Sequence, residues 1–424
     1  MSEFDKIIGY DDIKAELVRF ANVLKEPEKY EKLGVTTPSG ILLYGDPGLG
    51  KTLMSKCFIA ETGCKVFTLR KEKPNGDFVN QIKDTFEAAK KETEGIVIVF
   101  LDDMDKFANE DNMHRDAEEY VAVQSCIDDC KGYGVFTLAT VNDRYCLPDS
   151  LLRAGRFDKV IEVEVPKGKD AEKIIDHFLA SKQIMGDIDI KEISRIMEGK
   201  SCAELETVIN EAGIYAGFEG KSKIDQTDVV KACMRMMFDS PECINPSDDA
   251  NTKNIAIHEA GHAVVAEVLD PGSVTLVSVC RHSGSVEGMT KTRRPDGHSI
   301  SKELQEHIVI GGLGGKAATE MLFGVADMGC NADMHKVFDM VAEFVDDNCT
   351  LGFDAFEGHN SSQHLLEKKD RLIASEVERY YQIAKKIIVE NRDFLNAVVD
   401  ALLDHKTVTY REMQTIRESL GRAA

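Results

Sequence analysis

The stretch "LLYGDPGLGKT" at residues 42–52 decides the fold of the first part of the chain. Gly45, Gly50, Lys51 and Thr52 satisfy the pattern G-x4-G-K-[ST], in which glycines let backbone N–H groups face phosphate oxygens. Lys51 can then reach the outer phosphates of a nucleoside triphosphate, and the Thr52 hydroxyl can ligate Mg²⁺. An apolar run precedes the pattern and a helical pattern follows it, which disfavours a chance glycine turn. The residues expected to bind the nucleotide are Gly45, Asp46, Pro47, Gly48, Leu49, Gly50, Lys51, Thr52 and Leu53.

Around this loop, residues 1–166 alternate apolar runs with helical patterns. The runs expected to form strands are 41–44, 65–69, 96–101, 135–140 and 160–165. Such continuous apolar runs suit a parallel sheet that is covered on both faces, so we expect an α/β domain. The run 96–101 ends in two acids, of which Asp102 can hold the metal and Asp103 can orient an attacking water.

The rest of the chain has a different pattern. Residues 167–238 are expected to be helical only, with Ser201 and Glu204 forming a capping box at one helix start. The composition of "SPECINPSDDAN" predicts a linker, which we place at 239–251. From 252 to 424 the patterns are mainly helical, with a strand-like insertion near 274–280.

Composition sets limits on the class of protein. A chain of 424 residues is too long for one ordinary core, and a net charge of -22 disfavours nucleic acid or an anionic membrane as a partner. Eleven cysteines without a CxxC pair indicate a reducing compartment. No secretory signal is visible, and the apolar run 96–101 is far shorter than the ~20 residues that span a bilayer. We therefore expect a soluble, cytoplasmic chain.

A second motif, "IAIHEAGHAVV" at residues 255–265, indicates a metal site. His258 and His262 are four residues apart, so on a helix they share one face and can bind one zinc ion. Glu259 is then placed to act as general base on the metal-bound water. The alternative is an ordinary buried helix with two hydrogen-bonded histidines, because H-E-x-x-H also occurs by chance.

A catalytic zinc site needs a third protein ligand and one open position. Spacing alone cannot choose among the downstream candidates. Asp333 falls in the first turn of an expected helix, where a carboxylate also suits the positive helix end. The candidates are Cys280, His282, His298, His307, Cys330, Asp333 and His335.

The segment "HIVIGGLGGKAATE" at 307–320 imitates a second phosphate loop. Ala317 follows Lys316, so the metal-binding hydroxyl is missing and the spacing is wrong. We expect its glycines to be points of close packing on a helix.

Together these motifs resemble the FtsH-type AAA+ zinc metalloproteases over nearly the whole chain. The resemblance implies a AAA+ P-loop domain with a helical lid, followed by a mainly α-helical zinc metallopeptidase domain. It places Gly9 and the lid residue His177 near adenine, and Asn142 of "LATVND" at the sensor of the γ-phosphate. "LPDSLLRAGRFDK" is similar to the arginine-finger segment, so Arg153 and Arg156 would reach a neighbouring subunit's nucleotide.

The resemblance also bears on the zinc site and on the function. "GGKAATEMLFG…GCNADM" is similar to the segment that carries the third zinc ligand, which moves Asp333 ahead of its rivals. Members of the family form hexameric rings that use ATP and Mg²⁺ to unfold and thread protein substrates, which the zinc sites then cut in an enclosed chamber. The implied partners are protein or peptide substrates and further copies of the chain.

Several features depart from the family. We expect no counterpart of the family's transmembrane segments, since the sequence begins with the part similar to the ATPase domain. Cys202 stands where the family usually has glycine. Asp103 is one methylene shorter than the usual glutamate, which predicts slow ATP hydrolysis. The substrate-gripping loop reads "RKEKPNGDFVNQ" at 70–81, and its one aromatic residue, Phe78, fits better in the following helix.

Three functions therefore stay open. The leading hypothesis is an ATP-driven protease of cytosolic proteins. The second is a zinc peptidase whose ring is only assembled or gated by ATP, with weak threading. The third is a remodelling or adaptor ATPase that cuts little.

Overall fold

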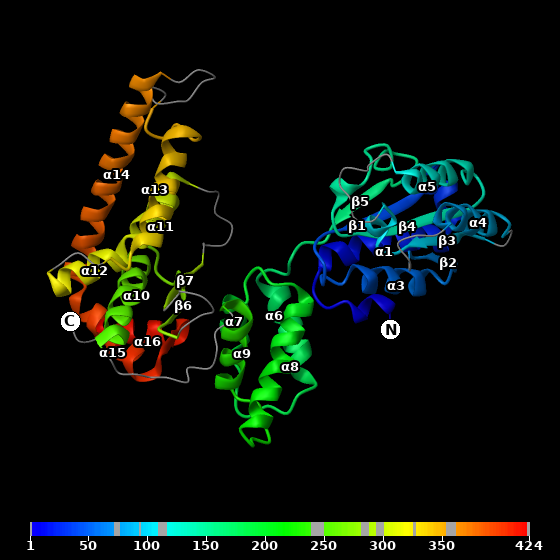
Figure 1. Cartoon of the computed structure of the whole chain (residues 1–424). Helices are drawn as coiled ribbons and strands as arrows, with labels where there is room; N and C mark the ends of the chain where they lie inside the picture. Colours follow the sequence, from blue (N-terminus) through cyan, green and yellow to red (C-terminus); the bar gives the residue numbers. More distant parts are fainter. Residues whose placement is uncertain are drawn as a thin grey trace. The chain divides into compact units, whose positions relative to one another are not determined.

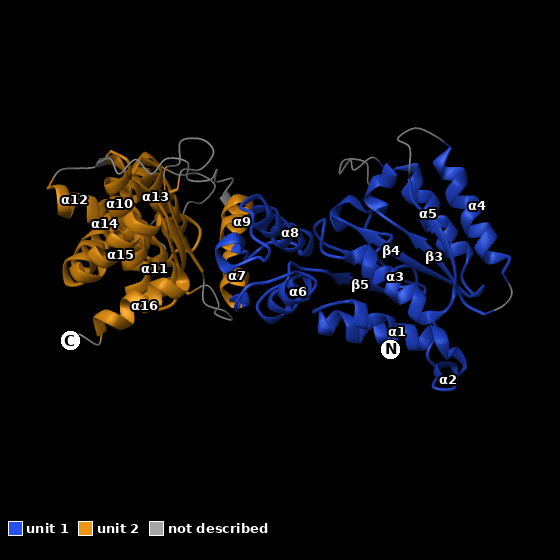
Figure 2. Cartoon of the chain, turned by 90° about the horizontal axis from the view of Figure 1, so that it is seen from below, with its two compact units in different colours: residues 1–190, 197–229 blue, residues 191–196, 230–424 orange. Residues whose placement is uncertain are grey.

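The computed structural model describes residues 2–71, 77–92, 95–108, 117–238, 250–280, 288–293, 301–324, 328–352 and 362–421. The chain divides into two compact units, one of residues 1–190 and 197–229 and the other of residues 191–196 and 230–424 (Figure 2). Among the helices described, none is both long enough and apolar enough to cross a membrane.

The first unit contains a five-stranded parallel sheet in the order β2-β3-β4-β1-β5. Its strands are β1 (Gly40–Tyr44), β2 (Lys65–Leu69), β3 (Val97–Leu101), β4 (Val135–Val141) and β5 (Lys159–Glu162). All five runs expected from the sequence are strands, and β5 ends three residues before the expected 165. The central strand β3 is buried at every position, which explains its continuous apolar run.

Helices cover both faces of this sheet (Figure 1). Phe58 of α3 stacks on Phe136 of β4 on one face, whereas α4 and α5 share an apolar cluster with Val97, Val99 and Leu101 on the other. The helical segments before the lid are η1 (Glu3–Lys6), α1 (Asp11–Lys25), α2 (Pro27–Glu31), α3 (Lys51–Thr62), α4 (Phe78–Lys90), η2 (Met104–Ala108), α5 (Glu118–Asp129) and η3 (Arg144–Cys146).

Four helices follow the sheet, as the sequence predicts: α6 (Lys169–Ala180), α7 (Ile190–Ile196), α8 (Cys202–Phe218) and α9 (Gln226–Phe238). The expected capping box at the start of α8 is confirmed. The Ser201 hydroxyl accepts from the backbone N–H of Glu204, and the Glu204 carboxylate accepts from the backbone N–H of Ser201. One isolated bridge, between Ile184 and Ile224, joins two loops of this region.

The second unit is mainly helical and contains a small antiparallel sheet in the order β7-β6-β8. The helices are α10 (Ala250–Leu269), α11 (Lys302–Gly312), α12 (Gly314–Phe323), α13 (Asn331–Asp346), α14 (Gln363–Glu390), α15 (Arg392–His405) and α16 (Tyr410–Gly421). The strands are β6 (Val274–Ser278), β7 (Met289–Thr292) and β8 (Thr407–Thr409). Only β6 was predicted from the sequence. Most of the expected linker lies outside the described residues, and α10 begins two residues before the expected 252.

The glycine-rich segment 307–320 is helical, as expected, and its glycines allow close packing. An added Cβ at Gly261 of α10 would lie 2.4 Å from the carbonyl oxygen of Gly314, so the two helix backbones approach closely. This crossing places α12 against the part of α10 that carries both histidines.

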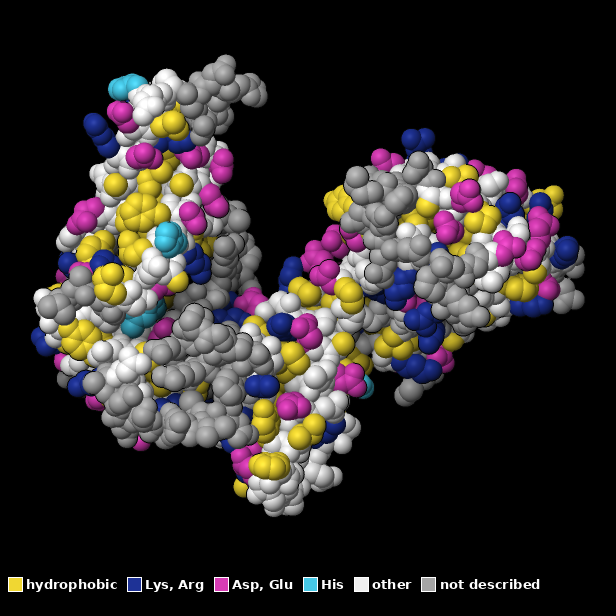
Figure 3. Space-filling view, viewed as in Figure 1, with side chains coloured by type: hydrophobic (Ala, Val, Ile, Leu, Met, Phe, Trp, Pro, Cys, Tyr) yellow, Lys and Arg dark blue, Asp and Glu magenta, His cyan; other side chains and the backbone are white. Residues whose placement is uncertain are grey.

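Charged side chains of both signs are interspersed on the face shown in Figure 3. Among the described residues on this face, Asp and Glu side chains spread over both units, and Lys and Arg side chains form no continuous basic surface.

Candidate functional sites

The phosphate loop lies between β1 and α3, at the carboxyl edge of the sheet. Gly45 has a φ of 143°, and an added Cβ would lie 2.1 Å from the carbonyl oxygen of Val163, so only glycine fits this position. Gly48 and Gly50 also have positive φ values, of 80° and 88°. The loop thus opens directly onto the start of α3 at Lys51, where backbone N–H groups can bind phosphate.

Lys51 connects the loop to the expected sensor residue. Its ammonium donates to the carbonyl oxygen of Asp46 at 2.8 Å and to Asn142 Oδ1 at 3.0 Å. Burial lowers the pKa of Lys51, although the surrounding aspartates act in the opposite direction. Asn142 in turn donates through Nδ2 to Asp105 at 2.9 Å. Asp105 follows Asp102 by only three residues, but no sequence motif predicts its role beside Asn142.

Asp102 and Thr52 meet as a magnesium site requires. The hydroxyls of Thr52 and Thr140 donate to Asp102 Oδ1 at 3.2 and 2.9 Å, and Asp102 is buried. A hydroxyl and a carboxylate at this separation form the oxygen-rich ligand set that Mg²⁺ prefers. The residues present therefore fit the ion beside the phosphate loop.

Asp103 is held by two cations. Its Oδ2 accepts from Arg70 at 3.2 Å and from Lys106 at 3.0 Å, and its backbone is left-handed with φ 53°. The carboxylate expected to orient water is thus in ion pairs within its own chain. Arg70 follows β2 directly, at the start of the expected substrate-gripping loop, whose residues 72–76 lie outside the described part of the chain.

The two residues expected near adenine lie in different settings. Gly9 has φ 70°, and an added Cβ would lie 3.1 Å from Asp170 Cβ. His177 lies on α6 with an exposed side chain, and its one described ring contact is with Phe178. The lid itself touches the phosphate loop, because the backbone N–H of Ala203 donates to the carbonyl oxygen of Gly48 at 3.1 Å.

The two expected finger arginines also differ. Arg153 is exposed, whereas Arg156 donates to both oxygens of Asp128, at 3.2 and 2.7 Å, and to the carbonyl oxygen of Ser150. The hydrogen bond from Arg156 lowers the pKa of Asp128 to about 2. Only Arg153 is therefore free of such an ion pair in the structure as described.

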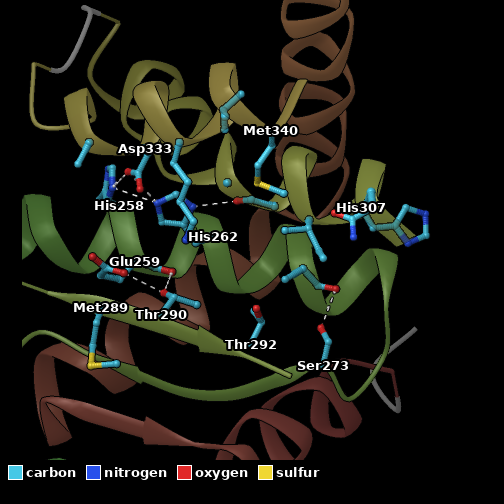
Figure 4. Close-up of a pocket in the computed structure, with 18 of the residues that line it drawn as sticks. His258, Glu259, His262, Ser273, Met289, Thr290, Thr292, His307, Asp333 and Met340 are labelled. Carbon is cyan, nitrogen blue, oxygen red and sulfur yellow. Dashed lines mark hydrogen bonds and ion pairs between the residues drawn. The ribbon is translucent and has the colours of Figure 1, made fainter. Parts of the chain in front are cut away.

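The second unit brings the two histidines and Asp333 together (Figure 4). His258 and His262 lie one turn apart on α10, and Asp333 lies in the first turn of α13. Asp333 Oδ2 is 3.0 Å from His258 Nε2 and 3.3 Å from His262 Nε2, and the two Nε2 atoms are 3.0 Å apart. Two imidazoles and one carboxylate within 4.8 Å of one another fit the three-ligand set of a catalytic zinc site.

The hydrogen bond of His262 leaves its Nε2 atom available to bind a metal. His262 Nδ1 lies 2.8 Å from the carbonyl oxygen of Gly311, so Nδ1 carries the proton and Nε2 has a free lone pair. An added Cβ at Gly315 would lie 2.5 Å from His262 Nε2 and 2.6 Å from His258 Cε1. Any larger residue there would enter the ligand cluster. The glycine pattern predicts close helix packing but not this contact with the two histidines.

Glu259 lies beside the ligands and is 8% exposed. Burial raises its pKa, while the neighbouring histidines and Thr290 act in the opposite direction. For Asp333, burial is outweighed by the hydrogen bonds from both histidines, which lower its pKa on balance. The arrangement holds a carboxylate base next to a ligand set with an open side.

The rival third ligands lie elsewhere or outside the described residues. His307 pairs with Asp270 at 3.0 Å, Cys280 lies near Thr407, and His335 is exposed on α13. Cys330 is buried directly before α13, and it belongs to no group of possible metal ligands among the described residues. His282 and His298 lie outside the described part of the chain.

The cluster opens into a groove of about 1340 Å³ within the second unit. Residues of α10, α11 and α13 line it, together with Gly288–Thr290 and Thr292 beside α10. A groove of this size has room for an extended peptide segment next to the three ligands.

Comparison with known proteins defines the class of each part. Residues 41–165 match the ATPase family associated with various cellular activities (AAA), residues 187–231 match the AAA+ lid domain, and residues 246–416 match Peptidase family M41. The chain is therefore a AAA ATPase with its lid, joined to an M41 peptidase domain.

Relatives extend this match over nearly the whole chain. An ATP-dependent zinc metalloprotease FtsH of Mycoplasmoides gallisepticum is 29% identical over 99% of this chain and 58% of its own length. FtsH 2 of Thermoanaerobacter sp. strain X514 is 27% identical over 98% of this chain and 82% of its own length. FtsH of Bacillus subtilis is 27% identical over 97% of this chain and 69% of its own length. The chain thus combines the AAA, AAA+ lid and M41 peptidase domains, and over nearly its whole length it is similar to FtsH-type ATP-dependent zinc metalloproteases.

Proposed function

We propose that this chain is an ATP-dependent zinc metalloprotease that degrades protein substrates. The observation that carries the proposal is the convergence of His258, His262 and Asp333 beside Glu259, in a chain that also has a complete phosphate loop. Because the chain spans only 58% of the first relative named above, the activity of the whole protein is inferred.

In this proposal each residue of the peptidase site has one role. His258, His262 and Asp333 hold Zn²⁺, which when bound polarises water and the substrate carbonyl. Glu259 accepts the proton of the attacking water and then delivers it to the leaving amine.

The nucleotide site acts on access to the groove and not on the peptide bond, whose hydrolysis is downhill. The loop 45–53 and Asp102 hold ATP and Mg²⁺, with Gly9 and His177 near adenine and Asn142 at the γ-phosphate. Arg153 and Arg156 serve a neighbouring copy's nucleotide, so the proposal includes a homo-hexameric ring. A cytoplasmic location and the domain limits 1–166, 167–238, 239–251 and 252–424 stay predictions.

One observation favours a second candidate, a zinc peptidase whose ring is gated by ATP and threads weakly. Phe78 is 5% exposed and packs edge-on against Phe107, with ring centroids 4.8 Å apart. This side chain cannot grip a substrate while it belongs to the core. Large aromatics provide such grip through contact area, which charged side chains do not replace.

Degradation of casein and of a stably folded, tailed fluorescent protein, each with and without ATP, tests the proposal. The full mechanism predicts ATP-dependent degradation of both. The gated peptidase predicts that only casein is degraded. The folded protein should survive, because a typical domain has a free energy of unfolding of ~5–15 kcal/mol and weak threading would not overcome it. Failure to cleave either substrate, with zinc bound and rings assembled, would contradict a protease.

A further inference from the structure

The strand β7 passes directly over the proposed catalytic base. Among the described strands it pairs only with β6, so it is an edge strand of the sheet. Gly288, just before the strand, has no room for a side chain. An added Cβ would lie 2.6 Å from Ile255 Cγ2 and 2.9 Å from Glu259 Cγ. The backbone therefore contacts α10 at Glu259 itself.

Thr290 lies two residues further on and faces the same side of the strand. Its hydroxyl oxygen is 2.8 Å from Glu259 Oε2 and 2.9 Å from the Glu259 carbonyl oxygen (Figure 4). The hydroxyl has one proton, and an ionised carboxylate accepts the stronger, charge-assisted hydrogen bond. Thr290 thus donates to Oε2, and its β-branched side chain has few alternative rotamers in a strand.

This contact matters because a glutamate side chain has three rotatable bonds. A general base works only within hydrogen-bond reach of the proton that it removes, and a displacement of ~1 Å can cost about 100-fold in rate. A donor on one carboxylate oxygen fixes the plane of the group. The second oxygen is then left to accept the proton of the attacking water.

We propose that Thr290 is a positioning residue, whose hydroxyl orients the Glu259 carboxylate for proton transfer. The inference rests on the proposed zinc peptidase function and adds to it a residue outside the H-E-x-x-H motif. It differs from a purely structural role, in which the hydroxyl only satisfies a buried acid and its loss lowers stability or zinc binding.

The test uses the full chain and a short fluorogenic peptide, with kcat, KM, zinc content and melting temperature measured for each variant. Thr290→Val keeps the shape and removes the hydroxyl, and we expect kcat to fall about 10- to 100-fold with KM and zinc content unchanged. Thr290→Ser keeps the hydroxyl and should retain kcat within about threefold. Thr409→Val, on the opposite edge strand β8, is the matched control and should match the wild type.

A double variant completes the design. When Glu259→Gln has removed the base, adding Thr290→Val should slow cleavage no further, since residues that act as a unit are not additive. Wild-type kcat in Thr290→Val, equal loss in Thr290→Ser, or loss of zinc or of the melting transition in Thr290→Val would each overturn the positioning role. Absence of cleavage by the zinc-loaded wild type would instead refute the proposed function, and the positioning role with it.

Discussion

The peptidase site and the nucleotide site of this chain differ in how many of their expected residues come together within a single copy. In the second unit, three ligand atoms and the base converge within one fold, on α10 and the first turn of α13. In the first unit, Lys51, Asp102 and Asn142 are assembled, but Arg153 is exposed and Arg156 is tied to Asp128. Among the described residues, the three proposed zinc ligands and the base thus come together within one chain, whereas the proposed function takes the finger arginine of the ATPase site from a neighbouring copy.

This difference has a physical basis. Zinc needs ligands at fixed short distances, and a helix with its i, i+4 pair supplies two of them from local geometry alone. Phosphoryl transfer needs positive charge around the γ-phosphate, and an arginine of a neighbouring subunit can supply part of it. In the proposed function, cleavage therefore depends on one fold, and ATP hydrolysis depends on an assembly of several copies.

The largest expected effect is on the completed site. Asp333→Asn replaces a zinc-binding carboxylate with an amide, and we expect zinc affinity to fall by at least about 100-fold, with peptide cleavage lost. ATP hydrolysis should stay near the wild-type rate, because Asp333 belongs to the other unit. Zinc content and both activities are measured together.

His335→Ala, two residues further along α13 and exposed, is the control for this variant and should keep the metal. Retention of zinc by Asp333→Asn would show that another residue is the third ligand. His282 and His298, outside the described residues, would then be tested first.

The next largest effect is on ATP hydrolysis, and it distinguishes the roles of Arg153 and Arg156. Arg153→Ala should reduce ATP hydrolysis by about 1000-fold and leave ATP binding and melting temperature unchanged, as for a finger that acts between subunits. Arg156→Ala should also lower the melting temperature, because it breaks the ion pair with Asp128. ATPase rates, nucleotide binding and thermal unfolding are the measurements.

Mixed rings then test the direction of the contact. Combining Arg153→Ala with Lys51→Ala creates some interfaces in which an intact phosphate loop meets an intact finger. ATPase activity that stays absent in mixed rings shown to form would argue that Arg153 does not act on a neighbouring copy.

Much of both sites could be predicted from the sequence because their signals are local. Continuous apolar runs identified all five strands of the parallel sheet, and the spacing of His258 and His262 identified the zinc pair. The capping box at Ser201 and the helical glycines of 307–320 were also correct. Each of these features depends on neighbours within a few residues.

Features set by tertiary contacts could not be predicted in this way. β7 has the sequence "MTKT", which carries little apolar signal, and it is a strand because it pairs with β6 and packs on α10. The contact of Gly315 with both histidines needs the crossing of α12 and α10. Likewise, the ion pair between Arg70 and Asp103 and the ion pair between Arg156 and Asp128 join residues that are 33 and 28 positions apart, so spacing rules could not reveal them.

The smallest expected effect concerns Asp103. Arg70→Ala removes one of the two cations on its carboxylate and should raise basal ATP hydrolysis up to about fivefold, since a partly exposed ion pair is worth about 1 kcal/mol at most. Lys65→Ala, at the first residue of β2, breaks a surface ion pair with Glu92 and is the control. A lower rate in Arg70→Ala would mean that Arg70 assists hydrolysis and does not restrain Asp103.

The central claim is that ATP hydrolysis gives protein substrates access to a peptidase site whose own cleavage step needs no ATP. The most direct measurement compares cleavage of a short peptide and of casein by the wild-type protein, with ATP and with a non-hydrolysable analogue. The rate of peptide cleavage should be the same with ATP and with the analogue, while the rate of casein cleavage should be at least about tenfold higher with ATP. Peptide cleavage that stops without hydrolysis, or casein cleavage that is equally fast with the analogue, would contradict the claim.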